Sequence, residues 1–124
     1  MAKVLVVEDN PANMTLATFL LKSTGYVVLS ATDAEIGLAL ARAEQPDLIL
    51  MDIQLPGMDG LTATALLKAD AATRDIPVIA LTALAMKGDE ERIRAAGCDG
   101  YIAKPLAYRE FLATVSTHLV RAPL

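Results

Sequence analysis

Five short apolar segments recur along this chain, and longer stretches between them carry apolar residues at every third or fourth position. Within the short segments the apolar residues are nearly continuous and do not alternate with polar ones, which is typical of strands covered on both faces. We therefore predict a parallel sheet between two layers of helices. The predicted strands are Val4–Val7, Tyr26–Leu29, Leu48–Met51, Ile76–Leu81 and Tyr101–Ala103.

The first two helices are indicated by their start signals. Asn10 and Pro11 suit the N-cap and the first position of a helix over residues 11–23. A second helix over residues 33–44 follows a possible capping box that begins at Thr32. The apolar stripe of this second helix is expected at Ile36, Ala39, Leu40 and Ala43.

Three more helices are predicted after the third strand. Residues 60–70 give a weaker pattern, with apolar positions at Leu61, Ala65 and Leu66. Residues 87–96 have acids early and arginines late, and Gly97 follows, an order that complements the helix dipole and ends the helix. Few of these residues are apolar, so we expect this helix to face solvent. The last helix has the clearest stripe, which consists of Tyr108, Phe111, Leu112, Val115 and Leu119.

Strand and helix thus alternate five times, without a linker or an internal repeat, in 124 residues. A length of this order suits one domain with one core. Because parallel crossovers are right-handed, the order predicts an open, doubly wound α/β sheet. We predict the flavodoxin-like strand order 2-1-3-4-5 with five helices, and residues 1–124 as a single domain.

Composition limits the classes of partner and the cellular location that the sequence predicts. The net charge is −4 and the pI about 4.8, which argues against a surface for nucleic acid or anionic membranes. The apolar runs are far shorter than the roughly 20 residues that span a bilayer. The single cysteine, Cys98, excludes an internal disulfide and fits a cytoplasmic location. We expect Cys98 to be a small core residue, since the lone His118 gives it no obvious base.

The candidate chemistry lies just past the strand ends, where ligands bind in sheets of this kind. Glu8 and Asp9 follow the first strand, Asp52 the third, Thr82 the fourth and Lys104 the fifth. Two carboxylates about 4 Å apart repel by roughly 4 kcal/mol at an effective dielectric near 20. Three carboxylates and one ammonium group leave two negative charges, which one Mg²⁺ would balance with oxygen ligands. A metal, a lysine and a carboxylate together indicate phosphoryl chemistry with the carboxylate as nucleophile.

Each residue taken alone has an ordinary alternative. Glu8 and Asp9 would also favour a helix N-terminus, and Asp52 would serve as a loop acid before the turn at Leu55-Pro56-Gly57. Thr82 would cap a helix, and Lys104 would be a solvated surface amine. The joint placement of these residue types at four separate strand ends favours the functional interpretation.

At these residues the sequence resembles the receiver domain of two-component response regulators, over essentially its whole length. The matching segments are VVEDN, LILMDIQLPGMDG around Asp52, VIALTA around Thr82, and GYIAKP at Lys104. The segment TALAMKGDEERIRAAGCDGYIAKP is especially similar to single-domain cell-cycle regulators of this family. The sequence also resembles receivers attached to hybrid histidine kinases.

The resemblance implies a phosphorylation site with Mg²⁺ as its cofactor. Asp52 would be the phosphoacceptor. Asp9 would bind the metal directly, Glu8 partly through water, and the main-chain carbonyl of Gln54 would be a further ligand. Gly57 would have a structural role in the turn after the third strand.

The resemblance also implies the groups that respond to phosphorylation. Thr82 would hydrogen-bond the phosphoryl group, and Lys104 would pair with a phosphoryl oxygen, positioned by a cis peptide bond to Pro105. Tyr101 would be a rotamer switch that turns inward when Thr82 moves; the alternative is a strand aromatic that packs on the helix over residues 87–96. Gln54 and Leu84 stand at positions that tune phosphoryl lifetime, which the sequence leaves open.

We therefore interpret the chain as a phosphorylation-controlled switch and not as an enzyme acting on a separate substrate. A histidine kinase or a histidine phosphotransfer protein would be the donor. The readout would be contact of a monomer with a downstream protein, through the face of the fourth helix, fifth strand and fifth helix. The alternative within this class is a detached receiver that passes phosphate along a relay.

Three other classes fit the residues less well. A flavodoxin-type FMN carrier would need hydroxyls and amides after the first strand, where this chain has EDNPAN. A haloacid-dehalogenase-type phosphatase would have D-x-D on the first strand, which here reads VVEDN. A phosphorylation-independent scaffold would not need Asp52, Thr82 and Lys104 together.

Overall fold

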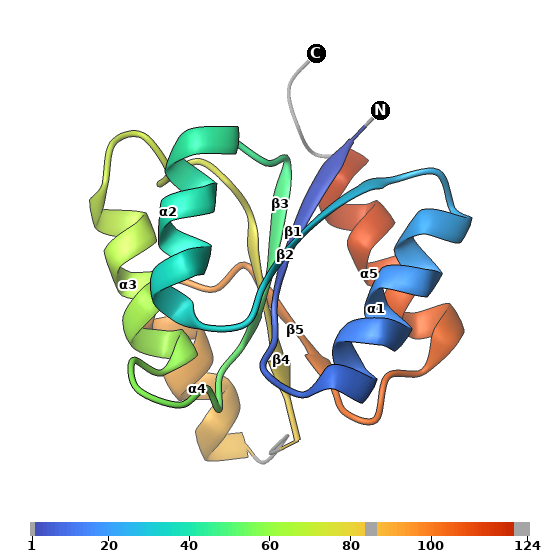
Figure 1. Cartoon of the computed structure of the whole chain (residues 1–124). Helices are drawn as coiled ribbons and strands as arrows, with labels where there is room; N and C mark the ends of the chain where they lie inside the picture. The colour runs from blue at the N-terminus through green and yellow to red at the C-terminus, as the bar shows by residue number, and fades with distance from the viewer. Residues whose placement is uncertain (1, 84–86, 121–124) are drawn as a thin grey trace.

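The computed structural model describes residues 2–83 and 87–120, and five strands alternate with five helices along them (Figure 1). The strands are β1 (Lys3–Val7), β2 (Val27–Ala31), β3 (Leu48–Asp52), β4 (Val78–Thr82) and β5 (Gly100–Ala103). The helices are α1 (Pro11–Ser23), α2 (Ala34–Glu44), α3 (Gly60–Ala69), α4 (Lys87–Ala95) and α5 (Tyr108–Val120). None of these helices is long and apolar enough to cross a bilayer.

The five strands form one parallel sheet in the order β2-β1-β3-β4-β5, as predicted. Figure 1 shows α1 and α5 on one face of this sheet and α2, α3 and α4 on the other. The chain passes from one face to the other at β2, between α1 and α2, and then returns to pair β3 with β1 on the side of β1 away from β2, so that the carboxyl ends of β1 and β3 lie side by side (Figure 1). The doubly wound architecture is therefore confirmed.

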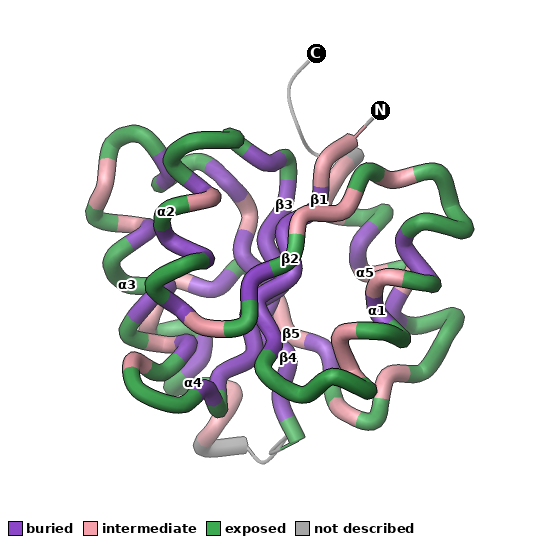
Figure 2. Tube along the Cα trace, viewed as in Figure 1, coloured by how far each residue is buried: buried purple, intermediate pink, exposed green. Residues whose placement is uncertain are grey.

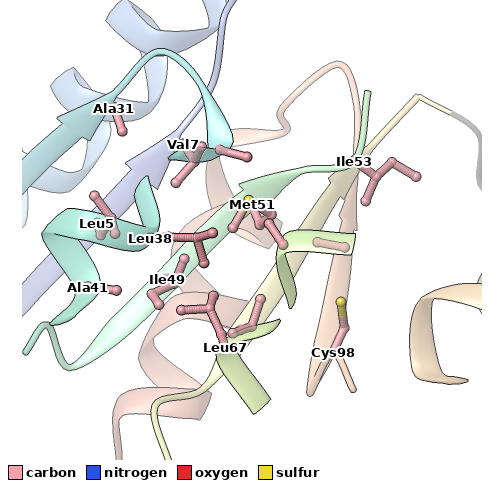
Figure 3. Packing of buried hydrophobic residues seen from close by; sticks show 14 of the residues in the cluster. Leu5, Val7, Ala31, Leu38, Ala41, Ile49, Met51, Ile53, Leu67 and Cys98 are labelled. Carbon is pink, nitrogen blue, oxygen red and sulfur yellow. The ribbon is translucent and has the colours of Figure 1, made fainter. Parts of the chain in front are cut away.

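The core lies on both faces of the sheet. Residues 4–7 of β1 and all of β3 and β4 are buried, which explains their continuous apolar sequence (Figure 2). One cluster packs beneath α2 and α3 and includes Leu38, Met51 and Leu67 (Figure 3). The other packs beneath α1 and α5 and includes Leu21 and Phe111. Cys98 is buried in the first cluster, as the sequence predicts.

Helix α2 differs from its prediction in both its cap and its buried face. Asp33, not Thr32, is the N-cap: its side chain accepts the Ile36 N–H at 2.8 Å. The predicted stripe was wrong, since Ile36 is 46% exposed and the buried residues are Ala34, Gly37, Leu38 and Ala41. Gly37 lies so close to Val7 that a Cβ there would approach its Cγ2 to 2.8 Å. The small residues let this helix approach the sheet, and that contact selects the face.

The buried face of α3 was also predicted wrongly. Its buried residues are Gly60, Ala63, Thr64 and Leu67, whereas Leu66 is exposed and Leu61 is only partly buried. Thr64 is satisfied there because its hydroxyl donates to the Gly60 carbonyl at 2.8 Å. A polar residue that bonds within its own helix is compatible with the core, which an apolar pattern does not reveal.

Two strands are displaced from their predicted bounds. β2 begins after Tyr26 and extends to Ala31, and Tyr26 instead packs against the core from the turn before the strand. β4 begins at Val78, because Ile76 belongs to a turn in which its N–H reaches the Thr73 carbonyl at 3.0 Å.

The last two helices largely follow their predictions. The described side chains of α4 are charged or small except for Ile93, which is buried. On α5, Phe111 and Val115 are buried and Leu112 and Leu119 are partly buried, but Tyr108 is exposed, so the stripe starts one turn later than predicted. Leu84 lies outside the described residues.

Candidate functional site

The carboxyl edge of the sheet brings together the side chains that follow four strands. Glu8 comes directly after β1, Asp52 and Thr82 are the last residues of β3 and β4, and Lys104 follows β5. Glu8, Asp52 and Thr82 are buried, and Asp9 is exposed. The strand order therefore turns four separate sequence segments into one crevice.

The β1–α1 turn fixes Glu8. The Glu8 N–H donates to the Ala31 carbonyl at 3.0 Å, and its Oε2 accepts the Asn10 N–H at 3.1 Å. Asn10 is the N-cap of α1, as predicted, and its Oδ1 accepts the Asn13 N–H at 3.1 Å. The short turn thus holds the glutamate inward while the helix begins beside it.

Asp52 is held by the loop that follows it and by the first residue of α3. Oδ1 of Asp52 accepts the Gln54 N–H at 3.0 Å, which orients the carboxylate. A Cβ on Gly60 would meet the carbonyl oxygen of Asp52 and lie 2.8 Å from the Cα of Ile53, so only glycine fits at this approach. Gly57 has a φ of +74°, a left-handed conformation that supports its predicted role in the turn.

Lys104 joins the two buried acids. Its Nζ lies 2.8 Å from Oε1 of Glu8 and 3.1 Å from Oδ2 of Asp52. Its own N–H donates to the Thr82 carbonyl at 2.7 Å, and its peptide bond to Pro105 is cis, as the resemblance implies. The ammonium group therefore lies between β1 and β3, although the residue comes from the β5–α5 connection.

The crevice carries more negative charge than its lysine balances. Burial, together with the side-chain contact to Asp52, raises the pKa of Glu8 to about 7 from its ordinary value of 4.5, despite the opposing effect of Lys104. Burial alone would lower the pKa of Lys104, but its contacts with Glu8 and Asp52 raise it above the ordinary value. Oε1 of Glu8 is buried and makes no hydrogen bond of good geometry; the ion pair with Lys104 is its contact.

These acids can hold a cation. One carboxylate oxygen from each of Glu8, Asp9 and Asp52 lies within 4.8 Å of the others. A donor set made of oxygen atoms, with one exposed member open to water, suits a hard dication such as Mg²⁺ better than zinc.

The other predicted residues have definite places. Thr82 is buried at the end of β4, beside β5. Tyr101, on β5, is partly buried and packs against the cluster beneath α2 and α3, which contains Ile93 of α4. That packing agrees with the structural alternative for Tyr101 and leaves its predicted switching role as a prediction.

Two features of the site were not predicted from the sequence. One is Gly60, whose sequence signal was the second glycine in the GMDG segment after Asp52. The other is the close pairing of Lys104 with Glu8: the sequence predicts that both lie at this edge, but it carries no signal for which acid the lysine contacts most closely.

Comparisons with known proteins agree with this geometry. Residues 4–116 match the model of the response regulator receiver domain. The chain is 51% identical over 116 residues to the polar-differentiation response regulator DivK of Brucella anthropi, and equally to that of Brucella ovis, covering 94% of each chain.

Solved structures show the same fold. A putative response regulator from Chloroflexus aurantiacus matches with a TM-score of 0.93 and 28% identity, covering 97% of this chain and 98% of that one. The receiver domain of a sensor histidine kinase from Pseudomonas aeruginosa matches with a TM-score of 0.89 and 38% identity, covering 96% and 98%. The latter was solved with a magnesium ion coordinated in its active-site cleft.

Proposed function

The chain belongs to the response regulator receiver domain family, and from this premise we propose that it is a switch controlled by phosphorylation of Asp52. The donor would be a phosphohistidine on a histidine kinase or a histidine phosphotransfer protein. One observation carries the proposal: the buried Asp52 carboxylate lies at the carboxyl edge of the sheet with Lys104 Nζ 3.1 Å from its Oδ2.

The transfer would use groups of this chain in defined roles. An oxygen of Asp52 attacks phosphorus, the bond from phosphorus to the donor nitrogen breaks, and its electron pair stays on the imidazole. The Gln54 N–H holds the other Asp52 oxygen at 3.0 Å and so orients the attacking one. Lys104 neutralises an oxygen of the incoming phosphoryl group, because its ammonium group is already within 3.1 Å of the nucleophile.

Mg²⁺ is the proposed cofactor. Asp9, Asp52 and the main-chain carbonyl of Gln54 would hold it, with Glu8 as a contributor through water. When bound, the ion would neutralise charge on the transferring phosphoryl group. The magnesium in the receiver domain from Pseudomonas aeruginosa supports this assignment.

The output would be protein contact. A phosphoryl group on Asp52 would draw the hydroxyl of Thr82 and the ammonium of Lys104 toward itself, and Tyr101 would follow, shifting the α4–β5–α5 face between two states. The described part of α4 has few apolar side chains, which suits an adjustable surface. The net charge of −4 favours a protein target over nucleic acid.

Some properties of this switch stay predictions. We expect residues 1–124 to act as one receiver domain, as a monomer and in the cytoplasm, with no turnover of a separate substrate. Gln54, exposed at the crevice, would influence phosphoryl lifetime. A relay intermediate is the second candidate, and rapid transfer from Asp52 to a second histidine protein would favour it.

The proposal is tested with acetyl phosphate and Mg²⁺, followed by intact mass. We expect wild type to gain one phosphoryl group and Asp52→Asn to gain none. Asp47→Asn, which changes an exposed aspartate at the opposite edge of the sheet, is the matched control and should behave as wild type. An adduct that persists in Asp52→Asn would overturn the site assignment.

A further inference from the structure

Both oxygens of the Glu8 carboxylate are already engaged within the protein. Oε2 accepts the Asn10 N–H at 3.1 Å, and Oε1 lies 2.8 Å from Nζ of Lys104. The Glu8 side chain is only 1% exposed, whereas the neighbouring Asp9 is exposed to solvent. Two adjacent acids at the same strand end therefore have different surroundings, and only Asp9 is open to the solvent from which a metal ion arrives.

Lys104 is shared unequally between its two acids. Its ammonium group is 2.8 Å from Glu8 and 3.1 Å from Asp52, so the closer ion pair is the one with Glu8. Oδ1 of Asp52 already accepts the Gln54 N–H at 3.0 Å. Without Glu8, Lys104 would pair with Oδ2 of Asp52 alone. Both oxygens of the nucleophilic carboxylate would then be occupied, Oδ1 by the Gln54 N–H and Oδ2 by the ammonium group.

We infer that Glu8 is a positioning residue for Lys104: it holds the ammonium group beside Asp52, close enough to receive a phosphoryl group, while the lysine charge is shared between the two acids and does not fall on the nucleophile alone. Asp9 and Asp52 then carry the greater part of metal binding. This inference rests on the proposed function of the site and adds a positioning residue to it. Glu8 acts through Lys104, and its longer side chain is what reaches across the crevice.

The first test is a double-mutant cycle in metal-free protein, read as melting temperature (Tm) at pH 8 in EDTA. Lys104→Met leaves two buried carboxylates without their cation and should lower Tm by roughly 5–10 °C. Adding Glu8→Gln should recover at least half of that loss, because it removes the stranded charge. A Glu8→Gln shift that is equal with and without Lys104 would refute the positioning role.

Asp9→Asn is the matched control for this cycle. It removes the neighbouring, exposed acid of the same strand end, and its effect on Tm should simply add to that of Lys104→Met. Coupling of Asp9 to Lys104 as large as that of Glu8 would also count against the inference, since the two acids would then be equivalent.

The second test needs no Lys104 variant. The rate of adduct formation with acetyl phosphate is measured against Mg²⁺ concentration for wild type, Glu8→Gln, Glu8→Asp and Asp9→Asn. Glu8→Gln should lower the rate at saturating Mg²⁺ by about tenfold, with the Mg²⁺ midpoint within about threefold of wild type. Asp9→Asn should mainly shift the midpoint. Glu8→Asp keeps the charge but retracts it, so it should resemble Glu8→Gln.

The outcomes separate the two proposals. A Glu8→Gln midpoint shifted as far as that of Asp9→Asn, with an unchanged maximal rate, would make Glu8 an ordinary metal ligand and end the inference. No adduct on wild type would instead refute the proposed function of Asp52. The metal-free thermal cycle would then still decide whether Glu8 positions Lys104.

Discussion

At each edge of the sheet a lysine side chain meets an aspartate, but the two lysines have different surroundings. At the amino-terminal edge, Nζ of Lys68 lies 2.9 Å from Oδ2 of Asp99 and donates to the carbonyls of Ile76 at 2.9 Å and Arg74 at 3.3 Å. The same Asp99 oxygen accepts the Val78 N–H at 2.8 Å. The three N–H groups of the Lys68 ammonium thus have three acceptors, and one positive charge balances one negative charge.

At the carboxyl edge the balance is missing. Lys104 faces two buried carboxylates, one of them with an oxygen that has no hydrogen bond of good geometry, and the exposed Asp9 adds a third acid. Buried charges persist when they are paired and hydrogen-bonded. The comparison shows that a lysine paired with one aspartate is balanced at the amino-terminal edge. At the carboxyl edge the additional acids leave negative charge that a bound cation would neutralise.

The largest expected loss of stability comes from adding a methyl group at Gly60, the glycine that packs against the main chain of Asp52. Gly60→Ala would drive a methyl group into the main chain of Asp52 and Ile53, which cannot move without shifting β3. We expect a loss of about 3 kcal/mol or more in the free energy of unfolding, measured by urea denaturation.

Gly100 supplies the matched control at the other edge. A Cβ at Gly100 would come within 3.1 Å of the His118 ring and 3.3 Å of Ile79 Cδ1, and both are side chains that can rotate. We expect Gly100→Ala to cost less than about 1.5 kcal/mol. Equal losses for the two variants would contradict the view that Asp52 is held by main chain packed against main chain.

A second prediction concerns pH in metal-free protein. The pKa of Glu8 is raised to about 7 from 4.5, so the folded protein keeps this proton at pH values where the unfolded chain has released it. The stabilisation that comes from the raised pKa of Glu8 is fully present below about pH 4.5 and is lost as the pH rises through about 7. In EDTA we expect wild type to lose up to about 3 kcal/mol relative to Glu8→Gln across this window. Parallel urea stability curves for the two proteins would be the contrary result.

The two edges also differ in how far the sequence predicts them. Asp52, Thr82 and Lys104 could be placed at one edge because each follows a continuous apolar strand, and the parallel order then brings the strand ends together. The pairing of Glu8 with Lys104, and of Lys68 with Asp99, could not be predicted, because each depends on which rotamer a long side chain adopts in the packed fold.

The helix faces show the same limit in the apolar layer. The predicted stripe of α2 counted apolar residues, but Ile36 faces outward because Gly37 and Ala41 allow the closest approach to the sheet. Periodicity predicts that a helix has a buried face, whereas the sizes of the residues in contact decide which face it is.

The smallest expected effect, and the most direct comparison of the two edges, is the response to Mg²⁺. An ion that binds the folded crevice and not the unfolded chain stabilises by RT ln(1 + [L]/Kd), about 1.4 kcal/mol at ten times Kd, or a rise of roughly 5 °C in Tm. Asp9→Asn should lose most of this rise. Lys68→Met should lower the starting Tm by breaking the complete pair at the amino-terminal edge, yet keep the full rise, because that edge contributes nothing to the crevice. If Lys68→Met lost the rise in Tm as Asp9→Asn does, the stabilisation by Mg²⁺ would not be specific to the carboxyl edge, and the assignment of the ion to that edge would be wrong.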